Sequence, residues 1–255
     1  MKNDSKIVAI MQPTYMPWMG YFSMIDKVDE FIFLDNVQLV GRSWQVRNKI
    51  KLDDREKMLT IPVKKTEKRE NRIIATTEYA GEEWKESHLG TIRMAYRKAV
   101  YFDEVFEFLE KLYRIKDSSI GNLNERFIQA IARRIGITTP FFRSSNMLCE
   151  GKKDELLVNL CKQRNAKRYL SAQGSAAYIE SVTPGGEFTN NQIDLFYHNY
   201  EHPIYQQQGE QFLEYIGIYD LLFNVGFERS LEVIRSGNRE DYSYIKFRRI
   251  CMGLA

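Results

Sequence analysis

The chain is poor in cysteine, has no long apolar run and carries no large excess of charge of one sign. Its 255 residues include three cysteines, none in a Cys-x-x-Cys or zinc-like spacing, which argues against a disulfide framework and a structural metal site. The apolar run at residues 7–11 is too short for a signal peptide, and no stretch approaches the roughly 20 apolar residues of a membrane span. We therefore expect a soluble, cytoplasmic protein.

The charged residues nearly balance, with 37 basic and 34 acidic side chains and a net charge of +3. Because a dedicated nucleic-acid-binding protein usually concentrates basic residues on one face, we expect no nucleic-acid partner. The densest basic segment, residues 64–69, is interrupted by Glu67. It favours a solvated loop, with a contact to an anionic substrate as the alternative.

The chain does contain enough apolar sequence for a full core. Hydrophobic residues make up 44% of it and aromatic residues 13%. Most of the rings are expected in the core, and some in a ring-lined pocket. Since the sequence shows no repeat, no low-complexity segment and no sharp change of composition, we predict one α/β domain over residues 1–255.

The N-terminal part predicts a βαβ unit followed by a hairpin. Residues 7–11 and 31–34 are apolar runs typical of buried strands, and residues 18–28 between them have helical spacing. Strand, helix and strand in this order imply a parallel pair with a right-handed crossover. Residues 43–50 and 58–63 are predicted to form a β-hairpin across a polar turn.

Three successive amphipathic helices then predict a helical insertion at about residues 82–137. The remaining sequence returns to alternating strands and helices. The expected helices of the insertion cover residues 82–98, 102–115 and 119–135, and the later elements are strands at 140–144, 168–171 and 192–197 and helices at 152–164, 212–223 and 230–236. The predicted fold class is α/β, with a Rossmann-like, mainly parallel sheet, the helical insertion and the hairpin.

Polar residues follow both strands of the predicted βαβ unit, and they form the first candidate site. These residues are Gln12, Tyr15 and Trp18 after the first strand, and Asp35, Asn36 and Gln38 after the second. Ligands of open α/β sheets bind beyond the carboxyl ends of the strands, where a helix N-terminus also offers free N–H groups. The cluster is predicted to orient an anionic or polyhydroxylated ligand. A polar loop with a helix cap is the alternative.

The hairpin sequence offers a second candidate. Arg47 and Asn48, with Trp44 nearby, could grip a phosphate or carboxylate through forked donors. A strand with one solvated face explains the same pattern. His88 has the residue type of a general base at neutral pH, but a histidine on the apolar face of a helix is also typical of a packed, hydrogen-bonded side chain.

Three further segments carry candidate ligand groups. One is a strand-to-helix junction whose small residues would let a ligand approach the backbone. These residues are Ser171, Gly174 and Ser175, and Tyr178 follows them. Gln206 lies in a His-Pro-Ile-Tyr-Gln segment. The helical pair four residues apart, Asp220 and Asn224, needs a partner if buried, either the fold itself or a ligand.

Together these segments resemble the WbqC-like family of bacterial proteins, in order and over nearly the whole chain. The segments that carry the resemblance are residues 12–22, 33–38, 44–48, 169–174, 203–206 and 220–224. The family usually has an asparagine where this chain has Val46, so no amide role is expected there. The resemblance implies an enzyme of O-antigen or surface-polysaccharide synthesis, described as a glycine transferase that acylates an amino sugar.

The functional prediction is therefore transfer of an amino-acyl group, with glycyl as the expected group, to an amino sugar that is nucleotide-linked. His88 or Asp35 would take the proton from the acceptor amine, and Arg47 with Asn48 would hold a phosphate or carboxylate. No metal and no definite cofactor is predicted, and ATP or a nucleotide sugar is the candidate nucleotide substrate. The sequence specifies no oligomeric state.

Two alternatives stay open. The strand followed by a proline-rich turn and a helix is similar to the HxGH nucleotidyltransferases, but residues 17–20 lack the two histidines that grip the triphosphate. An inherited nucleotide-sugar crevice remains compatible with that turn. The second alternative is a non-catalytic scaffold in glycan assembly.

Overall fold

The computed structural model describes residues 6–65 and 72–253. Most of the basic segment at residues 64–69 therefore lies outside the described residues. No helix in the described part is long and apolar enough to cross a membrane. The prediction that residues 1–255 form one domain stays a prediction.

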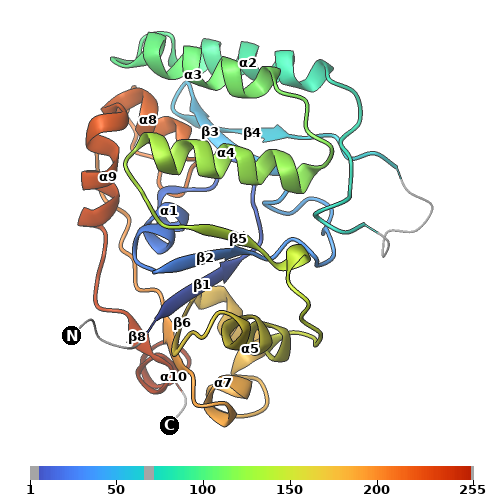
Figure 1. The fold of residues 1–255 in the computed structure, drawn as a ribbon. Helices are drawn as coiled ribbons and strands as arrows, with labels where there is room; N and C mark the ends of the chain where they lie inside the picture. Colours follow the sequence, from blue (N-terminus) through green and yellow to red (C-terminus); the bar gives the residue numbers. More distant parts are fainter. Residues whose placement is uncertain (1–5, 66–71, 254–255) are drawn as a thin grey trace.

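The described part of the chain contains a six-stranded sheet in the order β5-β2-β1-β6-β7-β8 (Figure 1). All neighbours are parallel except the last pair. The parallel strands thus follow the order 3-2-1-4-5 of the Rossmann arrangement, which confirms the predicted fold class. The strands are β1 (Ile7–Met11), β2 (Glu30–Phe33), β5 (Phe141–Arg143), β6 (Arg168–Ser171), β7 (Asp194–Tyr197) and β8 (Tyr242–Ser243).

Strands β1 and β2 are apolar apart from Glu30 at the start of β2, because helices cover both faces of the sheet. Ala9 of β1 and Phe31 and Phe33 of β2 belong to one hydrophobic cluster, whereas Val8 and Ile32 belong to the other. This alternation is the pleat of a strand with two buried faces. The first cluster includes residues of α1 (Met19–Asp26), α2 (Glu83–Tyr96), α3 (Phe102–Arg114), α4 (Ile120–Arg134), α8 (Tyr219–Val225) and α9 (Phe227–Ser236); the second includes residues of α5 (Asp154–Gln163), α6 (Ala176–Ile179), α7 (Gly186–Asn190) and α10 (Tyr244–Cys251).

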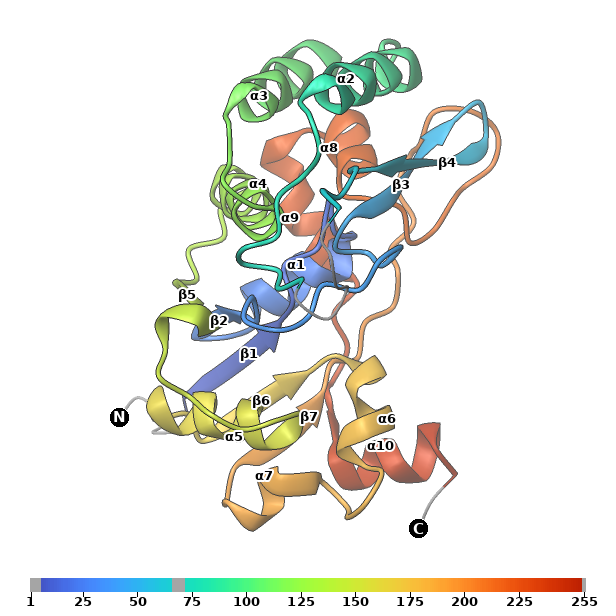
Figure 2. The same cartoon turned by 90° about the vertical axis from the view of Figure 1, so that its right-hand side faces the viewer.

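The hairpin and the helices α2 to α4 lie on one side of the sheet, as Figure 2 shows. The predicted helices of the insertion are confirmed within a few residues at each end. The hairpin is also confirmed, but its paired strands are β3 (Arg47–Leu52) and β4 (Arg55–Thr60), joined by a two-residue turn. Asp53 and Asp54 in that turn have φ of 49° and 57°, the backbone that a tight hairpin turn requires.

The predicted helix at residues 212–223 is wrong over its first half, since α8 begins at Tyr219. The backbone before it bonds to other elements instead of to a helical turn. The N–H of Gly217 donates to the carbonyl of Lys49 at 2.8 Å, and that of Ile218 donates to the carbonyl of Pro17 at 3.0 Å. The helix predicted at 230–236 begins earlier, at Phe227. Neither β8 nor α10 was predicted.

Candidate functional site

A cavity of about 320 Å³ lies at the carboxyl ends of β1 and β6. The chain leaves β1 for β2 on one side, whereas β6 lies beside β1 on the other. This is the topological switch point, where ligands of open α/β sheets bind. We call it the edge cavity; its lining consists of Met11, Trp18, Gly20, Tyr21, Met24, Ala172, Gln173, Gly174, His198, Tyr200 and Tyr215.

The proline-rich turn after β1 is held in place by amide side chains from distant elements. The Nδ2 group of Asn48 donates to the carbonyls of Tyr15 and Met16 at 3.0 and 2.7 Å. The Nδ2 group of Asn124, on α4, donates to the carbonyl of Pro13 at 3.1 Å. Since the turn forms no regular ladder of its own, these donors satisfy its buried carbonyls. The result is a fixed starting point for α1.

The indole of Trp18 lies over the first turn of α1 and forms an aromatic wall of the edge cavity. A Cβ atom on Gly20 would collide with this indole, so only glycine permits the arrangement. The indole stacks on the imidazole of His202, with centroids 6.1 Å apart and an interplanar angle of 10°. It also meets the rings of Tyr200 and Tyr215 edge-on, at 5.5 and 5.2 Å. Flat apolar faces of this kind stack on sugars and nucleobases.

His198 supplies a polar group whose tautomer is set by two partners. The hydroxyl of Ser23 donates to Oδ1 of Asn238 at 2.5 Å. Its one hydrogen is then used, so Nε2 of His198, 2.9 Å from the same oxygen, must be the donor. Nδ1 therefore carries a lone pair, and no group in the described part of the chain bonds to it. Burial, and secondarily the charge of Lys27, lowers the pKa of His198 to about 3, which keeps the ring neutral.

The structure brings only some of the predicted residues to this cavity. Trp18 and Gly174 line it. Ser171 is fully buried at the end of β6, and the N–H of Ser175 donates to the carbonyl of Ala172. Gln12 lies next to the lining, where its Oε1 atom accepts from Nε2 of Gln45 at 2.6 Å. Tyr178 lies further along, on α6.

Tyr15 and His88 meet in a separate buried network. The hydroxyl of Tyr15 is 2.8 Å from Nδ1 of His88 and also contacts the hydroxyl of Tyr113. Burial lowers the pKa of His88 to about 4, against a hydrogen bond with the backbone of Thr60 that raises it. His88 does not line the edge cavity, and its geometry is that of a packed, neutral imidazole.

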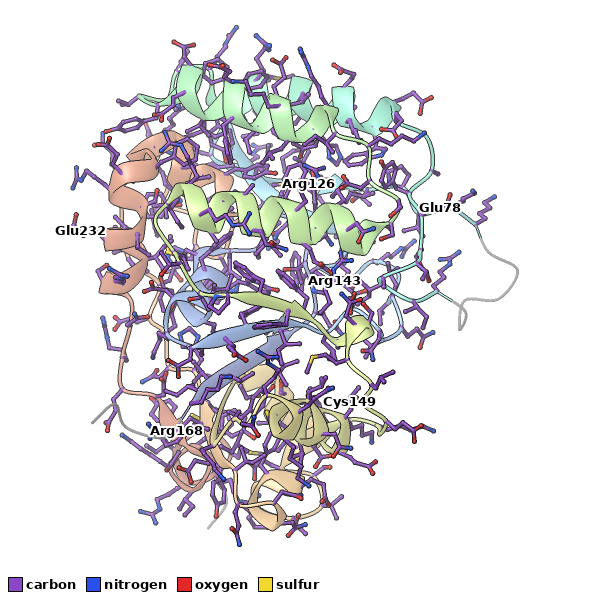
Figure 3. The ribbon with its side chains drawn as sticks, in the orientation of Figure 1. Glu78, Arg126, Arg143, Cys149, Arg168 and Glu232 are labelled. Atoms are coloured by element: carbon purple, nitrogen blue, oxygen red, sulfur yellow. The ribbon has the colours of Figure 1, made fainter. Side chains whose placement is uncertain are left out.

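Asp35 is fully buried and fastens the end of β5. Its carboxylate accepts from the backbone N–H and the hydroxyl of Ser145 at 2.8 and 2.6 Å, and from the hydroxyl of Ser144 at 3.0 Å. Next to it, Arg143 pairs with Glu125 of α4; Figure 3 labels Arg143 at this edge and Arg126 on the helix. These hydrogen bonds indicate a structural role for Asp35.

The other predicted residues lie apart from the edge cavity. Trp44 is half exposed on the hairpin side, under the Lys49 ammonium group. The Nε atom of Arg47 is buried without a hydrogen-bond partner among the described residues. Gln38 forms an isolated antiparallel β-bridge with Ile73.

The C-terminal candidates also lie elsewhere. Gln206 is exposed, and Asp220 and Asn224 share one face of α8, where Nδ2 of Asn224 donates to the carbonyl of Asp220 at 2.7 Å. The catalytic assignment of His88, Asp35 and Arg47 stays a prediction.

Sequence reasoning missed much of the lining, chiefly Gln173, His198, Tyr200 and Tyr215. The last three lie in or just before the long segment between β7 and α8, which forms no helix and shows no period. The signal that could have found them is the density of rings between residues 197 and 215.

Comparison with known proteins gives two matches. The model of the WbqC-like protein family matches residues 12–231. A protein of Mycobacterium tuberculosis (strain ATCC 25618 / H37Rv), named uncharacterized protein Rv1507c, is 33% identical over 225 residues, which cover 88% of this chain and 95% of that protein. No solved structure matches the chain significantly. The chain belongs to the WbqC-like protein family.

Proposed function

We propose that the edge cavity binds a nucleotide-linked amino sugar and that the protein transfers an amino-acyl group, glycyl, to its amine during surface-polysaccharide synthesis. The observation that carries the binding step is the aromatic wall at the switch point of the sheet, formed by Trp18, Tyr200 and Tyr215. The identity of the acyl group rests on the resemblance to the WbqC-like family.

The cavity offers complementary groups for the parts of such a ligand. Aromatic faces stack on the sugar or the base. The start of α1 lies at the cavity, where Trp18 makes no side-chain cap, so the positive end of the helix dipole would favour a phosphate there. Small residues at Ala172 and Gly174 leave room for close approach, since a Cβ on Gly174 would meet nothing within 4 Å.

The chemical step is nucleophilic acyl transfer. The neutral amine of the sugar attacks the carbonyl carbon of an activated glycyl ester or thioester, a C–N bond forms, and the bond to the oxygen or sulfur leaving group breaks with its electron pair. His198 lines the cavity and its Nδ1 atom carries a lone pair, so we assign it a hydrogen bond that orients the attacking amine, which releases its proton to water. His198 is therefore a positioning residue, and the base predicted at His88 or Asp35 stays a separate assignment.

The test is a transfer assay with the purified protein. A UDP-linked amino sugar with a free amine is incubated with a glycyl thioester, or with glycine and ATP, and the sugar product is weighed by mass spectrometry. A gain of one glycyl residue supports the proposal. Saturable binding of the sugar without any mass gain would indicate a nucleotide-sugar-binding protein and would contradict the transferase assignment.

Gly20→Ala tests the aromatic wall without touching the sugar directly. The new methyl group displaces the Trp18 indole, and we expect binding of the UDP-linked amino sugar to weaken about tenfold, because a stacked ring contributes roughly 1–3 kcal/mol. Calorimetric titration measures the change. The matched control is Gly90→Ala on α2, where a Cβ meets nothing within 4 Å. Equal affinity of the Gly20→Ala variant and wild type would contradict the placement.

A further inference from the structure

A second and larger cavity, of about 550 Å³, lies away from the sheet edge. We call it the hairpin cavity, because the β3–β4 turn forms one wall. The end of α2 forms another wall, and Gln208 and Gly209 line it from the loop before α8. Figure 2 shows this loop running beside the tip of the hairpin. Lys51 and Asp220 line the interior.

The wall of the hairpin cavity is well ordered, because Asp54 in the β3–β4 turn binds the loop before α8. Its carboxylate accepts from the N–H groups of Glu210 and Gln211 at 3.1 and 3.3 Å, and pairs with Nζ of Lys51 at 3.0 Å. A Cβ on Gly209 would collide with the same carboxylate, and Gly209 has a φ of 84°. These contacts, led by the backbone bond from Glu210, lower the pKa of Asp54. The loop is therefore fixed against the hairpin.

The floor of the cavity carries a carboxylate that the protein only half satisfies. Asp220 is 0% exposed. The hydroxyl of Tyr205 donates to its Oδ2 atom at 2.7 Å, whereas Oδ1 has no well-formed hydrogen bond in the described part of the chain. Burial raises the pKa of Asp220 to about 6, against the hydroxyls of Tyr205 and Tyr96 and the charge of Lys51 in the same cavity. A buried carboxylate with a free acceptor is costly unless a cation or donor meets it.

The rim carries the opposite charge at the end of α2, whereas the hairpin turn adds the exposed carboxylate of Asp53. Arg97 and Lys98 follow the last turn of α2, are exposed, and form no ion pair within residues 6–65 and 72–253. A metal does not fit the floor, since the described residues contain no group of three or more acidic, histidine or cysteine side chains able to hold one. A ligand that satisfies floor and rim together carries an ammonium group at one end and an acid at the other.

We propose that the hairpin cavity binds a small zwitterion, with its ammonium group on Asp220 and its carboxylate at Arg97 and Lys98. This site is distinct from the edge cavity and does not depend on the transfer reaction proposed for it. The ammonium group of the ligand donates to Oδ1 of Asp220, the acceptor that has no hydrogen bond of its own in the described part of the chain. The exposed guanidinium and ammonium groups on the rim select for the acid end.

The experiment is calorimetric titration of the full chain near neutral pH with glycine, β-alanine and γ-aminobutyrate, which space the two charges differently. Methylamine and acetate serve as half-ligands. We expect saturable binding of at least one zwitterion, weaker binding of both half-ligands, and a loss of about tenfold or more in Asp220→Asn, which keeps the shape but removes the charge. Asp103→Asn, an exposed carboxylate on α3, is the matched control and should bind like wild type.

Two results would overturn the proposal: no saturable binding of any zwitterion to wild type, or equal binding by Asp220→Asn. Should Asp220→Asn fail to fold by circular dichroism, the double change Arg97→Ala and Lys98→Ala decides. Both side chains are exposed, so the fold is expected to survive. This variant should weaken zwitterion binding and leave methylamine binding unchanged; unchanged zwitterion binding would overturn the assignment equally.

Discussion

His198→Gln is expected to lower glycyl transfer by about a hundredfold while the UDP-linked amino sugar still binds, since misplacing a reacting group by about 1 Å can cost about 10²-fold in rate. The reason is that His198 lines the edge cavity and its Nδ1 atom carries a lone pair, because Nε2 donates to Ser23. Steady-state kinetics with separate kcat and KM values checks this. The loss should appear in kcat.

His88→Gln is the matched comparison, since it removes the histidine that the sequence predicts as the base. It should keep most of the turnover, because His88 is enclosed with Tyr15 away from the cavity. Full turnover in His198→Gln, combined with its loss in His88→Gln, would return the role to His88. Ser23→Ala should give an intermediate loss, and ¹⁵N NMR of the His198 ring should then show a mixed tautomer.

Mild acid is expected to destabilise the protein strongly, through the same two histidines. Both are neutral when folded, with pKa values lowered by burial to about 4 for His88 and about 3 for His198, from an ordinary 6.5. As the pH falls below about 6.5 the unfolded chain takes up protons that the folded chain cannot, so stability is lost. Each histidine should contribute about 3 kcal/mol of that loss between pH 6.5 and 4.

Urea unfolding at a series of pH values measures the effect. The pH dependence should become shallower in His88→Gln and in His198→Gln, and shallowest in the double variant, whatever their stability at neutral pH. The groups facing His198 are Lys27, Ser23 and Tyr200. An unchanged slope in both single variants would show that the rings are not buried as described.

The strands of the sheet were predictable because their information is local. A strand such as Ile7–Met11 can be apolar throughout only where both of its faces are covered. The turn residues that follow it indicate where the strand ends. The position of Trp18 beside the site followed from the same segment. The helices of the insertion were predictable from their apolar stripes.

The composition of the site was less predictable because its partners come from distant sequence. Asn124 of α4 fastens the turn at Pro13, and Asn48 of β3 fastens Tyr15 and Met16, so these amides act on the backbone and not on a ligand. Asp35 serves the end of β5 in the same way. Polar residues that share a sequence neighbourhood were thus divided among several networks by tertiary contacts.

The helix predicted from residue 212 failed for a related reason. Apolar residues at helical spacing are present there, but the backbone of Gly217 and Ile218 is committed to β3 and to the turn after β1. Tertiary hydrogen bonds override the local pattern. The extended segment that results brings Tyr215 to the edge cavity and Gln208 to the hairpin cavity.

We propose the switch-point cavity at the end of β1 as the ligand site of this WbqC-like protein. The most direct measurement is a crystal structure with a UDP-linked amino sugar. We predict the ligand in the edge cavity, with a ring stacked on Trp18 or Tyr215 and a phosphate near the start of α1. A ligand ordered instead at Arg47 on the hairpin, with the edge cavity closed, would contradict the claim.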